Sequence, residues 1–456
     1  MRQAHNIQTV LILIIMFGLV VFSFNPFISR DEPLLLYDIK RLFVIVVIGF
    51  ALTCNLANNQ LKSTTYNSWF TLERESKYVL ITIIASSIIS TLIAKYPLGA
   101  ATQWAYILGL IMMTFILKPI AFLERKRIWQ YYCWISVLLF FSVAFGFWIR
   151  VSHGLNASQF TILSFANPRF LNQVHVWLII PIAYLCVLQL KHNQRAELLR
   201  LVMAMSFAVI MATNARGITI SITGAFLILI LFDMPHRKLW LRLFWQSVFF
   251  GIIISLVFLH PLPSILLDLK GDLEPIDTGS AGRIDLWLET IGMIQFWGLG
   301  GEAFVCDSVK FGRPHNSVLN IMVHWGVIPA IGFCILCAKC FIDTLKSKHT
   351  RTKVAGVTLL SGLAYSLVSG TLSSPLSQLL AVLSCAIYWG STATKLDIKK
   401  SIPKGFVVIF SLVTMVFIFA SGYRVYDRFS HYPEYQEMVK TQFWIGFNCI
   451  AHPDKT

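Results

Sequence analysis

The sequence has few charged residues for its length. Charged side chains make up 13% of the 456 residues, and only 22 residues are Asp or Glu. In soluble proteins about a quarter of the residues are charged, so this composition excludes an ordinary soluble domain. Hydrophobic residues make up 56% of the chain, and the class that fits is a polytopic membrane protein.

Repeats and processing signals are missing as well. No internal repeat or low-complexity stretch is present, which argues against a repeat architecture. The first apolar run, residues 7–24, is followed by "NPFISR" and has no small-residue cleavage site. It is therefore expected to be a retained first span and not a removed signal peptide.

About thirteen apolar runs are long enough to cross a membrane. They occupy residues 7–24, 41–57, 78–94, 100–117, 128–148, 173–190, 198–213, 217–233, 243–260, 317–338, 354–368, 376–394 and 405–422. The expected fold is an all-α polytopic membrane protein with about 12–13 transmembrane helices. Residues 1–456 are expected to form one transmembrane domain, with a long loop at 261–316 that holds short interfacial helices and an outer tail at 423–456.

The positions of Lys and Arg predict the orientation. With the N-terminus inside, every short inner loop holds three or more basic residues, as the positive-inside rule requires. The net charge of +16 is therefore interpreted as a topology signal, and no nucleic-acid partner is expected. The long loop, the tail, residues 150–172 and the turn at 213–217 then lie on the outer side.

Three arginines of the outer segments stand out. Arg169 lies in "FANPRF", Arg216 in the tight turn "TNARG", and Arg283 after "GSAG" at the start of an amphipathic segment. A charge this close to hydrocarbon is costly, so Arg216 is expected to face a wet cavity or a partner. A side chain that snorkels to the interface is the alternative interpretation.

The segment "GRPHNSVLN" at 312–320 adds a histidine to this face. Asn316 or Ser317 is expected to cap the helix that follows. His315 then lies at the positive end of that helix, which favours neutral imidazole and suits a general base. Arginines beside such a base suit an anionic diphosphate next to a hydroxyl that loses a proton, because guanidinium makes paired hydrogen bonds to phosphate oxygens.

These motifs resemble those of the O-antigen ligase superfamily, which includes O-antigen polymerases and protein O-oligosaccharyltransferases. The resemblance covers mainly residues 160–335. It rests on the order and spacing of "FANPRF", "TNARGITIS", "SAGRIDLW" and "GLGGEAF…RPHNSVLNIMVHWGVIPA". It implies a bacterial inner-membrane enzyme that transfers a glycan from undecaprenyl diphosphate to an acceptor hydroxyl on the periplasmic side.

The resemblance also implies roles for single residues. Arg216 and Arg283 would bind the diphosphate, and His315 would take the acceptor proton in a single, inverting displacement without a metal. Members often have a second histidine just before the last motif, where this chain has Arg313 and Pro314. Arg313, Asn316 and Arg169 are the further candidates for substrate binding.

The acceptor is left open by the sequence. An O-antigen ligase uses lipid A–core, whereas a protein O-oligosaccharyltransferase glycosylates a pilin or another periplasmic protein, as the aromatic-rich outer tail would favour. An O-antigen polymerase is a third possibility. A lipid-linked sugar transporter is the alternative from another class, but transporters place charges near the bilayer midplane, and here they collect at one face.

Metal and cysteine chemistry complete the candidates. Asp272, Glu274 and Asp277 could hold Mg²⁺ or Mn²⁺, but acidic residues of a loop are usually solvated, so no cofactor is expected. "CILCAKC" at 334–340 has zinc-like spacing but lies at the inner end of a helix, where packing is the better interpretation. Cys306 and Cys449 both fall on the outer side and are expected to form a disulfide.

Overall fold

The structure is a computed structural model, and it describes residues 2–25, 33–155, 162–259, 282–308, 312–393, 402–433, 443–446 and 449. The described residues form helices and no strand. In chain order the elements are α1 (Arg2–Ser23), α2 (Pro33–Ala57), α3 (Asn59–Phe70), α4 (Arg74–Leu92), α5 (Pro97–Leu123), α6 (Arg125–Ser152), α7 (Pro168–His175), α8 (Ile179–Lys191), α9 (Glu197–Ala212), α10 (Arg216–Phe232), η1 (Met234–His236), α11 (Arg237–Phe258), α13 (Arg283–Gly292), α14 (Ala303–Asp307), α15 (Ser317–Trp325), α16 (Val327–Lys346), α17 (Thr350–Tyr365), η2 (Thr371–Ser373), α18 (Pro375–Ser391) and α19 (Lys404–Ser430).

The prediction of an all-α protein with many membrane spans is confirmed. Eight helices of the described chain are long and apolar enough to cross a membrane, or nine if the bent pair α7 and α8 counts as one span. Helices α9, α10, α17 and α18 match four more predicted spans but have only 16 or 17 residues each. Among the described residues, these four helices are thus shorter than the length that identifies a span by composition, although they coincide with predicted spans.

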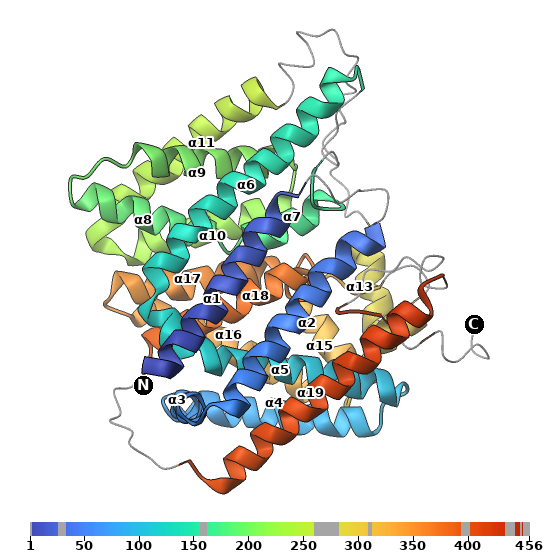
Figure 1. The fold of residues 1–456 in the computed structure, drawn as a ribbon. Helices are drawn as coiled ribbons and strands as arrows, with labels where there is room; N and C mark the ends of the chain where they lie inside the picture. The colour runs from blue at the N-terminus through green and yellow to red at the C-terminus, as the bar shows by residue number, and fades with distance from the viewer. Residues whose placement is uncertain are drawn as a thin grey trace.

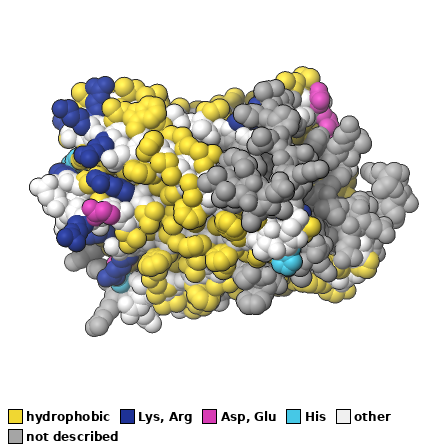
Figure 2. Space-filling view, turned by 90° about the horizontal axis from the view of Figure 1, so that it is seen from above, with side chains coloured by type: hydrophobic (Ala, Val, Ile, Leu, Met, Phe, Trp, Pro, Cys, Tyr) yellow, Lys and Arg dark blue, Asp and Glu magenta, His cyan; other side chains and the backbone are white. Residues whose placement is uncertain are grey.

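In Figure 1 the long helices α1, α2, α6, α11 and α19 are roughly aligned with one another, whereas α4 and α5 cross their direction. Helix α1 starts at the end marked N in Figure 1, and α19 runs in the same direction and finishes near α13 and the start of α2. The C-terminal end of α19 therefore lies opposite the N-terminal end of α1. Seen from above, a broad band of hydrophobic side chains crosses the middle of the molecule, and many Lys and Arg side chains gather at one end (Figure 2).

The predicted span at 317–338 is divided in two in the structure. Helix α15 ends at Trp325, and α16, which is long enough to span, begins at Val327. Between them Gly326 has φ +92° and ψ −178°, a conformation that only glycine adopts readily. A Cβ at this position would also collide with the backbone of Phe296 and Trp297. The span thus begins after Gly326, and α15 is a separate short helix.

The last helix also differs from the sequence-based boundary. Helix α19 continues past residue 422 to Ser430, and the side chains of Arg424 and Arg428 are buried in this extension. Within the long loop, α13 and α14 are the described helices, and residues 260–281 lie outside the described residues. Leu286 of α13 packs against Phe304 and Val323, so this amphipathic helix is anchored to α14 and α15.

Candidate functional site

Four of the predicted site residues, three arginines and one histidine, lie at or directly before the start of a helix. Arg169 is the second residue of α7, Arg216 is the first of α10, and Arg283 is the first of α13. His315 comes directly before Asn316, the N-cap of α15. Helix starts carry partial positive charge and unsatisfied amide groups, so four positive helix ends accompany these residues.

Two of the four helices are capped by asparagine. The Asn316 Oδ1 atom accepts hydrogen bonds from the backbone N–H groups of Val318 and Leu319 at 3.0 and 3.1 Å. The Asn167 Oδ1 atom likewise accepts from Arg169 at 2.9 Å, at the start of α7. Helices α10 and α13 begin without a side-chain cap. Their first amide groups are therefore the ones that a bound anion could satisfy.

The imidazole of His315 lies among arginines. The pKa of His315 is lowered from 6.5 to about 3, chiefly by burial and then by the positive charges of Arg313, Arg169 and Arg283, in that order of effect. Burial is thus a larger cause of the neutral form than any single charge. At neutral pH the imidazole ring is therefore uncharged, and it avoids the free-energy cost of burying a charge.

Arg283 is the electrostatic centre of the cluster. Burial lowers its pKa, and the neighbouring cations Arg169 and Arg216 lower it as well. The structure therefore brings Arg169 and Arg216 close enough to Arg283 for their charges to repel it, although the turns that carry them are far apart in the sequence. A cluster of like charges of this kind is stabilised by an anion that binds between them.

A large cavity begins at this cluster. It has a volume of about 1350 Å³, and Arg216 and Arg283 both line it. Most of the rest of its wall is apolar and comes from α10, α16 and α17; examples are Ile220, Phe333 and Leu360. The described residues that line it include no Asp or Glu. The cavity thus combines a cationic part with a long hydrocarbon-like wall.

Arg313 lies behind this cavity and does not line it. Its side chain is buried, its Nη1 atom donates to the Ser373 carbonyl oxygen at 3.1 Å, and its guanidinium lies over the Phe170 ring. A Cβ added at Gly370 would collide with the guanidinium, so this glycine makes room for it. The positive charge of Arg313 also lowers the pKa of His315.

The glycine-rich motif before α14 holds the start of the site in place. Leu299 and Gly300 donate backbone hydrogen bonds to the Val323 and His324 carbonyls, at 2.8 and 2.9 Å. Gly298 lies so close to the backbone of His324 and Gly326 that a side chain there would collide with them. The "GLGG" segment therefore forms backbone hydrogen bonds with the C-terminal end of α15 and fixes the position of that helix.

Sequence reasoning missed the segment that joins these helices. Residues 365–370, between α17 and η2, contact the starts of α10 and α15 and the middle of α7. The Ser366 carbonyl oxygen accepts a hydrogen bond from the backbone N–H of Ser317 at 3.0 Å. The Ser369 side-chain Oγ atom accepts a hydrogen bond from the Gln173 side-chain Nε2 atom at 2.9 Å. No predicted motif covers this segment, and its serines give no local signal.

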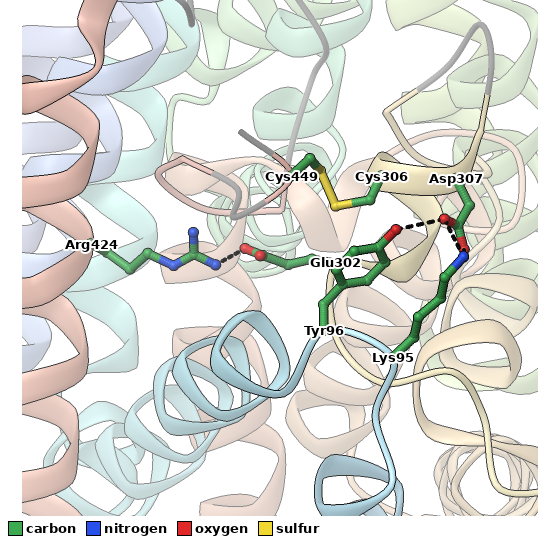
Figure 3. Close-up of a disulfide and its surroundings, with 7 residues drawn as sticks. All are labelled: Lys95, Tyr96, Glu302, Cys306, Asp307, Arg424 and Cys449. Atoms are coloured by element: carbon green, nitrogen blue, oxygen red, sulfur yellow. Dashed lines mark hydrogen bonds and ion pairs between the residues drawn. A yellow bond between two sulfur atoms is a disulfide. The ribbon is translucent and has the colours of Figure 1, made fainter. Parts of the chain in front are cut away.

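The C-terminal segment is linked covalently to the site loop. The structure contains a disulfide between Cys306 and Cys449, which are 143 residues apart. Figure 3 shows this disulfide beside an ion pair between Arg424 and Glu302, and beside Asp307, which binds Lys95 and Tyr96. Cys449 is thus held against α14, a few residues before Arg313.

The other cysteines show no metal centre. Cys334, Cys337 and Cys340 are free thiols on α16, and the first two line the large cavity. Among the described residues no group of His, Cys, Asp or Glu is placed to hold a metal ion. Asp272, Glu274 and Asp277 lie outside the described residues.

Comparison with known families agrees with this arrangement. Residues 201–334 match the family model described as O-antigen ligase, which confirms the resemblance to the O-antigen ligase superfamily. The matched segment contains Arg216, Arg283, Arg313, His315 and Asn316 and ends before Tyr365. No curated protein matches the chain significantly.

Proposed function

We propose that this multi-pass membrane protein transfers a glycan en bloc from undecaprenyl diphosphate to an acceptor hydroxyl. The premise is its relation to glycosyltransferases of the O-antigen ligase and polymerase type. The reaction takes place on the periplasmic face of the bacterial inner membrane. The observation that carries the proposal is the cavity that has Arg216 and Arg283 beside a long apolar wall.

The cavity suits a donor that has two chemically different parts. A polyprenyl chain would lie along α10, α16 and α17, where burial of each CH₂ group is worth about 0.8 kcal/mol. The diphosphate would lie at Arg216 and Arg283, whose helices begin without a side-chain cap. Their guanidinium groups and the first amide groups of α10 and α13 would then donate to the phosphate oxygens.

The proposed reaction is one displacement at the anomeric carbon. The acceptor oxygen forms a bond to this carbon while the bond from the carbon to the diphosphate oxygen breaks, and undecaprenyl diphosphate leaves with the bonding electrons. Arg216 and Arg283 stabilise the charge that develops on the leaving group, a contribution typically worth about 10²–10³ in rate. The acceptor proton passes to His315, and the configuration at the anomeric carbon inverts.

His315 becomes a better base when the donor is bound. In the protein by itself the neighbouring arginines and burial keep its pKa at about 3. A diphosphate among these arginines offsets their positive charge, which raises the pKa of the imidazole in the complex. Proton transfer is then favoured only after the donor has bound, so the donor helps to activate its own acceptor.

No metal is required in this proposal, because the arginines neutralise the leaving group. The remaining cations, Arg169 and Arg313, add to the positive potential, as both act on His315. Transfer is therefore expected to continue in excess chelator. A complete loss that Mg²⁺ or Mn²⁺ restores would overturn this part of the proposal.

The preferred acceptor is a lipid-anchored saccharide of the lipid A–core type. A second cavity, of about 350 Å³, lies on the other side of α15, with polar residues such as Ser317 and Asn320 and an apolar wall from α4, α5 and α18. It includes no charged residue among those that line it. Such a cavity suits the acyl chains of an acceptor whose hydroxyl approaches His315.

The test is reconstitution with purified components. The protein is mixed with glycan-linked undecaprenyl diphosphate and is offered lipid A–core or a pilin in separate reactions. Glycosylated lipid A–core supports the proposal, glycosylated pilin would identify a protein O-oligosaccharyltransferase, and an elongated glycan would identify a polymerase. His315→Ala is expected to retain donor binding and lose transfer by about 10²–10⁴-fold; full transfer by this variant would overturn the base assignment.

A further inference from the structure

Tyr365, the last residue of α17, touches the start of α10 from behind. Its side chain is 3% exposed, and a Cβ added at Gly217 would lie only 2.9 Å from its Cε2 atom. Gly217 directly follows Arg216, so the tyrosine ring supports the turn that presents this arginine. Tyr365 does not line the large cavity, whereas its neighbours Leu363 and Ala364 do.

Tyr365 lies within electrostatic reach of the arginine cluster. Arg283 and Arg169 both act on it electrostatically, and its side chain forms a hydrogen bond with Ser369. Ser369 in turn accepts a hydrogen bond from Gln173 of α7, at 2.9 Å. The phenol oxygen is therefore fixed in place by a buried chain of side chains, with its negative dipole end available to cations.

This position bears on the charge repulsion at Arg283. The charges of Arg169 and Arg216, which are exposed, repel that of the half-buried Arg283, and solvent screens a partly buried charge less than an exposed one. Tyr365 acts favourably on the charge of Arg283, and its ring supports the turn of Arg216, so both effects oppose the separation of the two arginines. The same tyrosine thus acts on the two arginines that line the cavity.

We propose that Tyr365 is a positioning residue of the donor site, which holds Arg216 through Gly217 and Arg283 through its hydroxyl before the donor binds. The inference rests on the proposed function, because it takes the diphosphate as the ligand of these arginines. It adds a residue outside the segment that matches the O-antigen ligase family.

The experiment compares tyrosine variants in purified, lipid-reconstituted protein. Tyr365→Phe removes only the hydroxyl, and Ser369→Ala removes the hydrogen bond that fixes it. Tyr132→Phe is the matched control, because Tyr132 of α6 is also buried and its hydroxyl has no hydrogen-bond partner among the described residues. Gly217→Ala displaces the ring by a different route. The measurements are the Kd of glycan-free undecaprenyl diphosphate, and the KM and kcat of transfer.

Loss of a positioning contact is expected to weaken donor binding more than it slows the chemical step. Tyr365→Phe should raise the Kd and the donor KM by about tenfold, which corresponds to about 1.4 kcal/mol. Ser369→Ala and Gly217→Ala should shift both constants in the same direction. A variant that is merely less well folded would instead lose kcat, with KM unchanged, because fewer molecules are active.

Two outcomes separate this inference from the function on which it rests. If Arg216→Ala and Arg283→Ala weaken donor binding while Tyr365→Phe behaves like Tyr132→Phe, the positioning role is wrong and the proposed function stands. If the arginine variants bind undecaprenyl diphosphate as tightly as the unaltered protein does, the positioning role and the proposed function are both wrong.

Discussion

Arg424, near the end of α19, forms a buried ion pair with Glu302, which lies directly before α14 (Figure 3). The two side chains are 0% and 4% exposed. The Arg424 Nε atom also donates to Thr102 Oγ1 of α5 at 3.0 Å. One arginine therefore connects the last long helix, a central helix and the loop that leads to His315.

This ion pair gives the first prediction. Arg424→Ala leaves the Glu302 carboxylate buried without its cation, and breaking a buried pair in this way typically costs about 3–5 kcal/mol. The measurement is the free energy of unfolding in detergent. Arg127→Ala is the control, because Arg127 pairs with Glu124 on the surface and such a pair is worth about 1 kcal/mol or less. Equal losses from the two variants would contradict the prediction.

The disulfide gives the second prediction. It closes a long loop between Cys306 and Cys449, and the chain-entropy model assigns about 5 kcal/mol to a loop of this size. Cys449→Ser is therefore expected to lower the melting temperature, and it should release Trp444 from its buried place beside Tyr106. Tryptophan fluorescence and proteolysis of the C-terminal segment check this. A thiol titration of the denatured, unreduced protein should find seven reactive cysteines; nine would show that the bond does not form.

The cap of α15 gives the third prediction. Asn316→Ala removes the acceptor of two backbone N–H groups, which should cost about 1 kcal/mol of stability. The same change should lower kcat, because the cap fixes the turn that carries His315. Asn58→Ala is the matched control: Asn58 caps α3 through Leu61, and α3 lies far from α13 and α15 in Figure 1. Asn58→Ala is expected to lose stability without a loss of kcat. A similar fall in kcat for Asn58→Ala and Asn316→Ala would contradict the proposed relation between the α15 cap and catalysis.

The pKa of His315 gives the fourth prediction. In the unfolded chain a histidine binds a proton near pH 6.5, whereas the folded protein binds one at His315 only near pH 3. The unfolded state therefore holds more protons between these values, and the free energy of unfolding falls as the pH falls. At pH 5 the contribution is about 2 kcal/mol relative to neutral pH.

His315→Gln tests this directly. Other groups titrate in the same range, so the informative quantity is the difference in unfolding free energy between the unaltered protein and the variant at each pH. The loss of stability on going from pH 7 to pH 5 should be smaller in the variant. If the difference in unfolding free energy between the two proteins is the same at pH 7 and at pH 5, His315 titrates near its ordinary pKa in the folded protein.

The membrane class and most helix positions could be predicted from local patterns. Runs of apolar residues such as 100–117 and 128–148 lie inside α5 and α6, because hydrocarbon requires a helix whose backbone groups are all satisfied. Asn316 as a cap was predictable for the same local reason. The break at Gly326 was not, because the run on both sides of it is apolar, and glycine is required there by its positive φ and by the close approach of the Phe296 backbone.

The sequence by itself determined the chemistry available to the site: arginines at helix starts, a histidine before a capping asparagine, and two outer cysteines. The tertiary structure decided which of these groups interact. It buried Arg424 beside Glu302 in a segment that the pattern assigned to an outer tail, placed Arg313 within electrostatic reach of His315, and brought Tyr365 to the arginines of α10 and α13. The physical reason is that helix formation and membrane insertion follow from neighbouring residues, whereas ion pairs and cavity walls depend on contacts between residues far apart in the chain.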